Sequence, residues 1–162
     1  MKIGGFRASL LAGFFAAAGM MCVAFFFQFH LELEPCPLCI LQRIVVIALG
    51  LVCLVGFVHN PSAWGRRVYG ILLVLLSIAG LGVAGRHVWL QHFPPPGFGE
   101  CGGSLQFLLD TLPLNQVLAK VFHGSGDCAE VVFRLLGLSI PEWTLIGFVF
   151  WLLYSLDVLR KG

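Results

Sequence analysis

The sequence predicts an all-α membrane protein, a four-transmembrane-helix bundle with a long polar loop between the third and fourth helices. Hydrophobic residues make up 59% of the 162 residues and charged residues only 11%, a composition outside the range of soluble domains. Four continuous apolar runs could each cross a bilayer core, which takes roughly 20 helical residues. The runs do not alternate between polar and apolar residues, as the strands of a membrane barrel do.

The first two predicted spans cover residues 8–29 and 40–58. The first contains no charged residue and the second contains only Arg43. Lys2 and Arg7 precede the first run, so a cleaved signal peptide is an alternative interpretation. Because the uncharged run is longer than a signal-peptide core, we favour a retained transmembrane helix.

The third and fourth predicted spans cover residues 68–90 and 143–159. Together the four spans predict a single integral membrane domain over residues 1–162, with loops 30–39 and 91–142 on one side of the membrane. A chain of this length holds one domain at most.

A glycine pattern inside the third span imitates a nucleotide-binding motif. Gly80, Gly82 and Gly85 have the GxGxxG spacing, but no strand precedes them, so dinucleotide binding is not expected. Gly80 and Ala84 lie one helical turn apart. Small residues at this spacing predict close packing against another helix.

The positive residues predict the orientation in the membrane, because Lys and Arg gather on the cytoplasmic side. Positive residues lie near both chain ends and in the connection 59–67: Lys2, Arg7, Arg66, Arg67, Arg160 and Lys161. Both termini and this connection are therefore expected in the cytoplasm. Four cysteines then lie on the opposite side, where disulfides persist.

Two of these cysteines form a CxxC motif at the start of the second span. Pro35 and Pro37 flank Cys36 and suit the first turn of a helix, where a missing N–H is harmless. The unpaired N–H groups and the dipole of a helix start favour thiolates at Cys36 and Cys39. Arg43 follows Cys39 by four residues, so both lie on one helix face. An arginine inside a span is a candidate functional residue, although it could also reach the lipid headgroups.

The other two cysteines lie in the long polar loop. Glycine and proline surround Cys101, so its backbone should be accessible to a partner. Cys128 follows Asp127, which forms a capping-box pattern with Glu130. This pattern predicts a short apolar helix that continues through Leu136.

Two further loop segments carry sequence signals. Ser139 and Glu142 repeat the capping-box pattern immediately before the fourth span. Leucines between residues 105 and 114 predict an amphipathic segment on the membrane surface.

The remaining cysteines and histidines are expected to have structural roles, with one exception. Cys22 and Cys53 lie inside spans, where cysteine behaves as a small hydrophobic residue. His30 and His59 should lie at the membrane interface. His87 is expected on the same side as the CxxC motif and at the depth of Arg43, which makes it a candidate site residue.

Taken together, these residues resemble the bacterial disulfide bond formation protein B (DsbB) family. The resemblance rests on Cys36, Cys39 and Arg43 in segment 36–43, His87 with Gln91, Cys101, segment 125–130 around Cys128, and segment 137–143. It covers essentially the whole chain and keeps the order and spacing of four spans and four cysteines. A CxxC motif alone is weak evidence, whereas the combined pattern is highly specific.

The resemblance implies a quinone-dependent protein-disulfide oxidoreductase of the bacterial inner membrane. It assigns two redox-active disulfides, Cys36–Cys39 and Cys101–Cys128. Electrons from a reduced DsbA-like periplasmic thioredoxin-fold protein would enter at Cys101 and reach a membrane quinone through Cys39.

The resemblance also implies the cofactor and the partners. Arg43 and His87 would bind the quinone, with ubiquinone expected and menaquinone as the other option, and no metal would be required. A monomer among membrane lipids is expected, with no nucleic-acid partner.

Three other functions compete with this interpretation. A vitamin K epoxide reductase-like quinone enzyme is the nearest, although its cysteine order fits less well. A non-enzymatic membrane scaffold would use the disulfides only for stability. A structural zinc site with four cysteine ligands is disfavoured because a second CxxC motif is missing.

Overall fold

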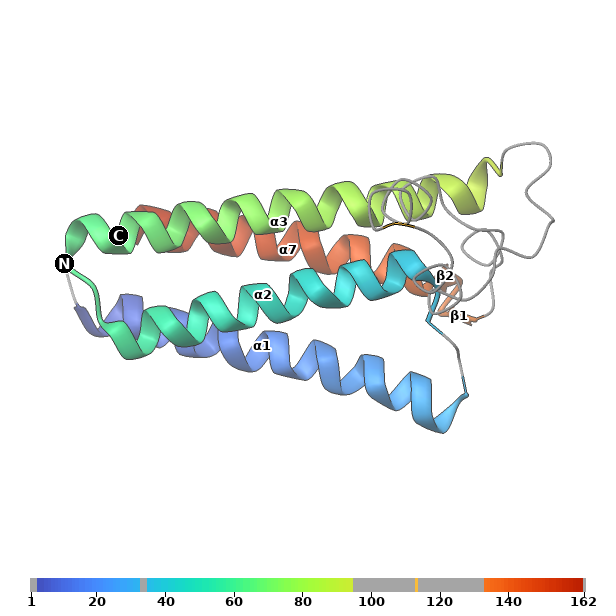
Figure 1. The fold of residues 1–162 in the computed structure, drawn as a ribbon, viewed down its shortest axis with the longest axis horizontal. Coiled ribbons are helices and arrows are strands. Elements are labelled where there is room, and N and C mark those ends of the chain that lie inside the picture. Colours follow the sequence, from blue (N-terminus) through green and yellow to red (C-terminus); the bar gives the residue numbers. More distant parts are fainter. Residues whose placement is uncertain (1–2, 33–34, 95–112, 114–132, 162) are drawn as a thin grey trace.

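The computed structural model describes residues 3–32, 35–94, 113 and 133–161. Within them, four helices are long and apolar enough to cross a membrane, and Figure 1 shows how they lie in the bundle. They are α1 (Ile3–His30), α2 (Pro37–His59), α3 (Ala63–His92) and α7 (Ile140–Lys161). The predicted class, a four-helix membrane bundle, is confirmed.

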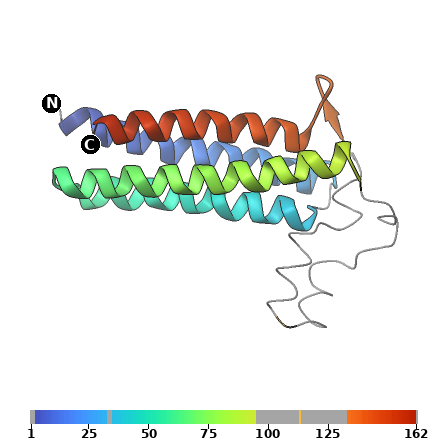
Figure 2. The same ribbon diagram turned by 90° about the horizontal axis from the view of Figure 1, so that it is seen from above.

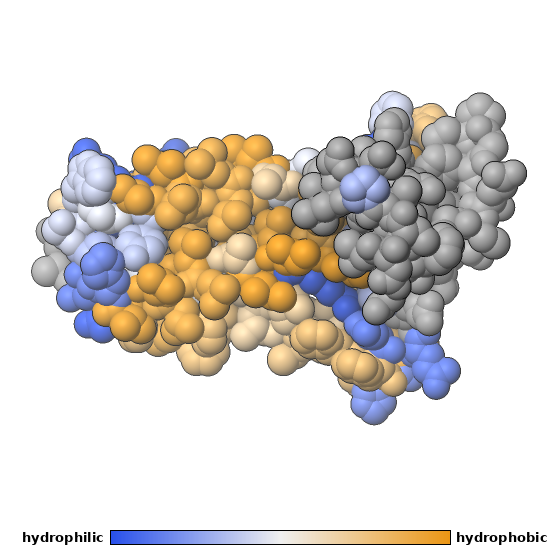
Figure 3. All heavy atoms as spheres, in the orientation of Figure 1, coloured by the Kyte–Doolittle hydropathy of each residue, from blue (hydrophilic) through white to orange (hydrophobic). Residues whose placement is uncertain are grey.

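The helices pack side by side in the order α1, α2, α3, α7, and α7 makes its main contacts with α3 rather than with α1. Both chain ends and the α2–α3 connection lie at one end of the bundle (Figures 1 and 2). The start of α2 and the start of α7 lie at the other end. On the face shown in Figure 3, apolar side chains form a broad band across the middle of the bundle, as expected for a surface in contact with lipid tails.

The connection between α2 and α3 is shorter than predicted. Asn60 ends α2 in the left-handed conformation, and its backbone N–H donates to the Gly56 carbonyl over 3.2 Å. Ser62 precedes α3 in an extended conformation. The helix therefore begins five residues before the predicted span, and Arg66 and Arg67 lie in its first turns rather than in a loop.

A small β-hairpin precedes α7, where the sequence had predicted a helix through Leu136. The strands β1 (Arg134–Leu135) and β2 (Leu138–Ser139) pair antiparallel. Leu136 and Gly137 connect them with φ values of 54° and 86°, the left-handed geometry of a two-residue hairpin turn. The predicted helix is thus wrong for residues 134–136, because the glycine turn lets the chain reverse there.

Close packing between α3 and α7 depends on small residues, as the glycine pattern predicted. A Cβ atom added at Gly80 would overlap the ring of Phe148 on α7, whereas one added at Gly82 would meet no atom within 4 Å. Ser77 and Ser155 pair their hydroxyl groups over 3.1 Å across the same interface. These contacts fix the rotation of α3 about its axis, and with it the direction in which its polar end points.

The two cysteines within the spans differ in their surroundings. Cys53 is fully buried in the bundle core, as expected of a small hydrophobic side chain. Cys22 is exposed on the outer surface of α1, within the predicted membrane span. The α1 helix meets neighbours along only part of its circumference, and Cys22 lies on the remainder.

Candidate functional site

The CxxC motif forms the first turn of α2. Cys36 is the N-cap residue in an extended conformation (φ −64°, ψ 161°), and Pro37 is the first helical residue. The Cys36 sulfur accepts a hydrogen bond from the Cys39 N–H over 3.4 Å. The Cys36 carbonyl accepts one from the Ile40 N–H over 3.1 Å. The predicted helix start is confirmed, and the Cys36 side chain caps it through the Cys39 N–H.

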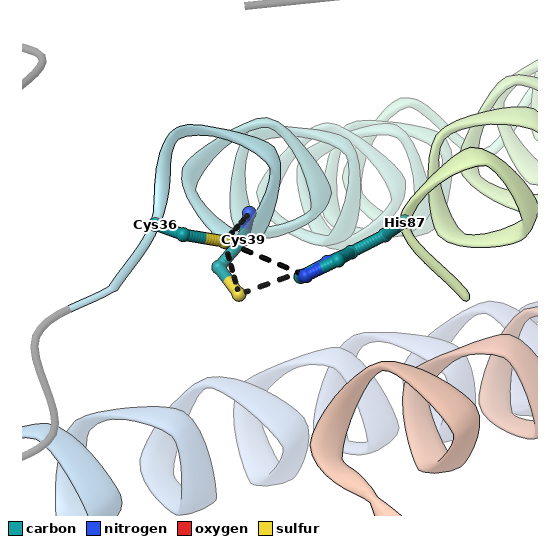
Figure 4. A group of neighbouring side chains, drawn as sticks. All are labelled: Cys36, Cys39 and His87. Atoms are coloured by element: carbon teal, nitrogen blue, oxygen red, sulfur yellow. Dashed lines mark hydrogen bonds between the residues drawn. The ribbon is translucent and has the colours of Figure 1, made fainter. Parts of the chain in front are cut away.

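His87 lies beside both sulfur atoms (Figure 4). The sulfurs of Cys36 and Cys39 are 3.1 Å apart and are not joined in a disulfide. His87 Nε2 lies 3.6 Å from the Cys36 sulfur, and Nδ1 lies 4.0 Å from the Cys39 sulfur. The histidine comes from the last turns of α3 and is only 2% exposed. Helix packing thus brings it against a motif 48 residues earlier in the chain.

Gln42 connects this histidine to α7 and was not recognised in the sequence. Its Nε2 lies 3.3 Å from His87 Nδ1, and its Oε1 accepts a hydrogen bond from Thr144 over 3.0 Å. Gln42 is 4% exposed, and a buried amide requires such partners. Its position within an apolar span could have marked Gln42 as a candidate site residue, because polar residues in a membrane span are costly and usually functional.

Arg43 contacts α1 rather than the cysteines and histidine in the hydrogen bonds that the structure gives it. Its Nη1 donates to the Gln28 side-chain oxygen, and its Nη2 donates to the Ala24 carbonyl over 3.2 Å. Its guanidinium carbon lies 5.8 Å from the centre of the Phe25 ring. The guanidinium therefore has protein partners and is not held by lipid headgroups alone.

An apolar cavity of about 490 Å³ lies between the end of α1 and the start of α7. Ala24 and Thr144 line this cavity. The Ala24 carbonyl also accepts a hydrogen bond from Arg43 of α2, and the Thr144 hydroxyl donates one to Gln42 of α2. A second apolar cavity of about 380 Å³ follows between the same helices, and Met20 lines both. The α1–α7 interface is therefore hollow beside the candidate site.

Polar contacts also hold the start of α7 against the end of α3. The Ser139 N–H donates to Glu142 Oε2 over 2.6 Å, which confirms one half of the predicted capping box. The Ser139 hydroxyl instead donates to Gln91 over 2.8 Å, and Glu142 pairs with His92 over 3.1 Å. These contacts join the two helices that supply His87 and Thr144.

The other predicted redox cysteines, Cys101 and Cys128, lie outside the described residues, as do the leucine-rich segment 105–112 and the capping box at Asp127. Their pairing and their approach to Cys36 stay predictions.

Comparisons with known proteins identify the family. The model of the family "Disulfide bond formation protein DsbB" matches residues 6–157. A protein of Nitrosococcus oceani named disulfide bond formation protein B is 51% identical over 138 residues, 85% of this chain and 82% of its own. Proteins of the same name from Marinobacter nauticus and Xanthomonas axonopodis are 47% and 46% identical over 91% and 97% of this chain, and over 88% and 94% of their own. The chain therefore belongs to the DsbB family of bacterial membrane disulfide oxidoreductases.

Proposed function

We propose that the protein reoxidises a DsbA-like periplasmic thioredoxin-fold protein and passes the electrons to a membrane quinone. Family membership supports this function, and one structural observation carries it. A cysteine pair forms the N-terminal turn of a membrane-spanning helix, with a buried histidine against both sulfurs. This arrangement supports a role for the cysteine pair as an exchangeable dithiol at the end of a membrane-spanning helix.

The orientation that this function requires has the CxxC end of the bundle in the periplasm and both termini in the cytoplasm. The positive residues favour it. The common position of the two termini at the end of the bundle opposite Cys36 and Cys39 is compatible with it (Figure 1).

Exchange begins in the loop disulfide Cys101–Cys128 that the family resemblance implies. A thiolate of the reduced partner attacks Cys101 and forms a mixed disulfide, which frees Cys128. The partner's second thiolate then releases the oxidised partner. The Cys128 thiolate attacks Cys36 of the Cys36–Cys39 disulfide, and Cys39 leaves as a thiolate.

The helix start stabilises the sulfur atoms during these steps. Backbone N–H groups and the positive end of the α2 dipole favour negative charge on Cys36 and Cys39. His87 contacts both sulfurs. Its imidazole could donate a hydrogen bond to a thiolate or accept a proton from a thiol. Cys101, freed when the oxidised partner leaves, attacks Cys128 of the Cys36–Cys128 disulfide, which reforms the loop disulfide and leaves Cys36 and Cys39 both reduced. Their return to the Cys36–Cys39 disulfide gives up two electrons and two protons, which a bound quinone would accept.

The residues beside the dithiol fit a quinone. A quinone, when bound, supplies an acceptor for two electrons and two protons. The apolar cavity of about 490 Å³ falls in the range of ligand pockets, roughly 300–1,000 Å³. Thr144 lines the cavity and Arg43 bonds to its wall at Ala24, so each could move to hold a carbonyl oxygen.

Anaerobic turnover of the purified protein with reduced DsbA tests this function. We expect oxidation of DsbA to be matched mole for mole by reduction of ubiquinone or menaquinone, each supplied alone. Comparison of the two quinones identifies the natural acceptor. Failure of both quinones to accept electrons, with a Cys36–Cys39 disulfide that resists reduction, would support the scaffold interpretation instead.

A further inference from the structure

Cys36, Cys39 and His87 also resemble a metal site. Each offers one ligand atom, and these atoms lie within 4.8 Å of one another. We propose that the reduced dithiol and His87 bind a thiophilic divalent cation, with Zn²⁺ as the reference ion, and that this binding holds the protein in an inactive state. The inference requires the reduced form of the CxxC pair and does not depend on a quinone.

Two of the three distances between the ligand atoms are close to those of a tetrahedral zinc centre, and the third, between the Cys39 sulfur and His87, is within 4.8 Å. Zinc binds sulfur at about 2.3 Å and imidazole nitrogen at about 2.0–2.1 Å, so tetrahedral neighbours lie about 3.8 Å apart for two sulfurs and about 3.6 Å for sulfur and nitrogen. His87 Nε2 already lies 3.6 Å from the Cys36 sulfur. The two sulfurs, now 3.1 Å apart, would need to separate by less than about 1 Å.

The surroundings of His87 also suit a metal ligand. If Nε2 binds the ion, Nδ1 must carry the proton, and metal-binding histidines usually donate that proton to a second group. Gln42 occupies this position, 3.3 Å from Nδ1. A half-turn of its amide would present the oxygen as acceptor to His87.

Thr144 permits this half-turn of the Gln42 amide. Its hydroxyl lies 3.0 Å from Gln42 Oε1 and 2.9 Å from the Pro141 carbonyl. It can therefore donate to Pro141 while accepting a hydrogen bond from the turned amide of Gln42. Both orientations of the amide keep their hydrogen bonds, which a buried polar group requires.

The cation can bind only when Cys36 and Cys39 are reduced. Binding releases one proton from each thiol, and the two thiolates then balance the charge of the cation. The Cys36–Cys39 disulfide has no thiolates and cannot form this centre. A bound cation conversely holds the sulfur lone pairs needed to reform the disulfide. Unlike a structural site with four cysteines, this centre needs neither Cys101 nor Cys128, and three protein ligands leave a fourth position open.

Metal binding to the protein in detergent tests the proposal. The loop thiols are first removed by Cys101→Ser and Cys128→Ser, and the remaining thiols are reduced with a phosphine that is then removed without oxygen. Zn²⁺ is titrated against a chromogenic chelator, and Cd²⁺ in a parallel sample reports thiolate ligation by its ultraviolet absorption. We expect one equivalent of cation per reduced chain and none on the form with the Cys36–Cys39 disulfide.

Variants then identify the ligands. His87→Gln should weaken binding at least about tenfold, by comparison with the 10–100-fold effects of mutating even the outer partners of metal sites. Cys22→Ser, which removes an exposed cysteine on α1, should leave binding unchanged. Equal binding to the reduced and oxidised forms would overturn the proposal without any need for a variant. Unchanged affinity in a folded His87→Gln variant would also overturn it. Because no quinone or partner is present, either result leaves the proposed function intact.

Discussion

The two cysteines of the CxxC motif have different positions, and the proposed function gives them different roles. Cys36 lies at the N-cap of α2, whereas Cys39 lies inside the first turn of this helix. The proposed function has the loop thiolate attack Cys36, the outer sulfur. It has Cys39, the inner sulfur, pass electrons to the quinone.

Replacement of Cys39 by Ala tests this assignment. We expect loss of quinone reduction, because the Cys36–Cys39 disulfide can no longer reform, while Cys101 still accepts attack from the partner. The measurement is anaerobic quinone turnover, with partner trapping on a non-reducing gel. Cys22→Ala is the matched control and should keep full activity, since Cys22 is exposed on α1. Normal turnover by Cys39→Ala would exclude its role.

Replacement of Arg43 by Met tests whether this residue binds quinone. We expect the quinone KM to rise at least about tenfold, equivalent to about 1.4 kcal/mol of binding, with a smaller effect on folding. Lys should restore binding only in part, because an ammonium lacks the planar fork of the guanidinium. Steady-state kinetics over a range of quinone concentrations provide the measurement.

Gln28→Met is the matched control for Arg43. It removes the side-chain acceptor on α1 while leaving the guanidinium in place. If Arg43 acts on the quinone, this variant should have a smaller KM effect than Arg43→Met. Equal effects would mean that Arg43 acts by holding α1 against α2.

At the scale of the helices, the interface between α3 and α7 positions His87 and Thr144. Gly80 lets the Phe148 ring approach the α3 backbone, and Ser139 and Glu142 fasten the start of α7 to the end of α3. A shift of α3 would move His87 away from the sulfurs. The glycine therefore contributes to the site without touching it.

Gly80→Ala and Gly82→Ala separate packing from helix propensity. The added methyl at Gly80 would overlap Phe148, and we expect the free energy of unfolding to fall by about 1–3 kcal/mol. The added methyl at Gly82 meets no atom within 4 Å, so this variant should gain up to about 1 kcal/mol from helix propensity. Unfolding in detergent micelles measures both, and equal changes would contradict the packing argument.

At the scale of the whole molecule, the proposed function requires electrons to travel from the long loop to the membrane. We expect Cys128→Ser to accumulate a covalent complex between Cys101 and the partner, because no loop thiol remains to carry the electrons onward. Cys101→Ser should trap much less. Non-reducing gels after incubation with oxidised DsbA, whose disulfide the free loop thiolate attacks to form the mixed disulfide, measure both. Equal or reversed trapping would exchange the roles of the two cysteines.

The sequence by itself determined the features that depend on residues close together along the chain. Four apolar runs sufficed to predict the helices, because every backbone polar group in a bilayer must be satisfied within its own segment. Pro37 and the cysteine spacing sufficed to predict the first turn of α2. The Leu136–Gly137 turn was missed because the apolar residues around it suggested a helix.

Only the tertiary structure decided which polar side chains meet. His87 lies against the sulfurs and Gln42 bridges it to Thr144, while Arg43 turns to α1. The sequence placed Arg43 and His87 at one depth, but depth does not fix the rotation of each helix about its axis. Close contacts such as Gly80 with Phe148 fix that rotation. They join residues far apart in the chain, and local sequence patterns carry no information about such pairs.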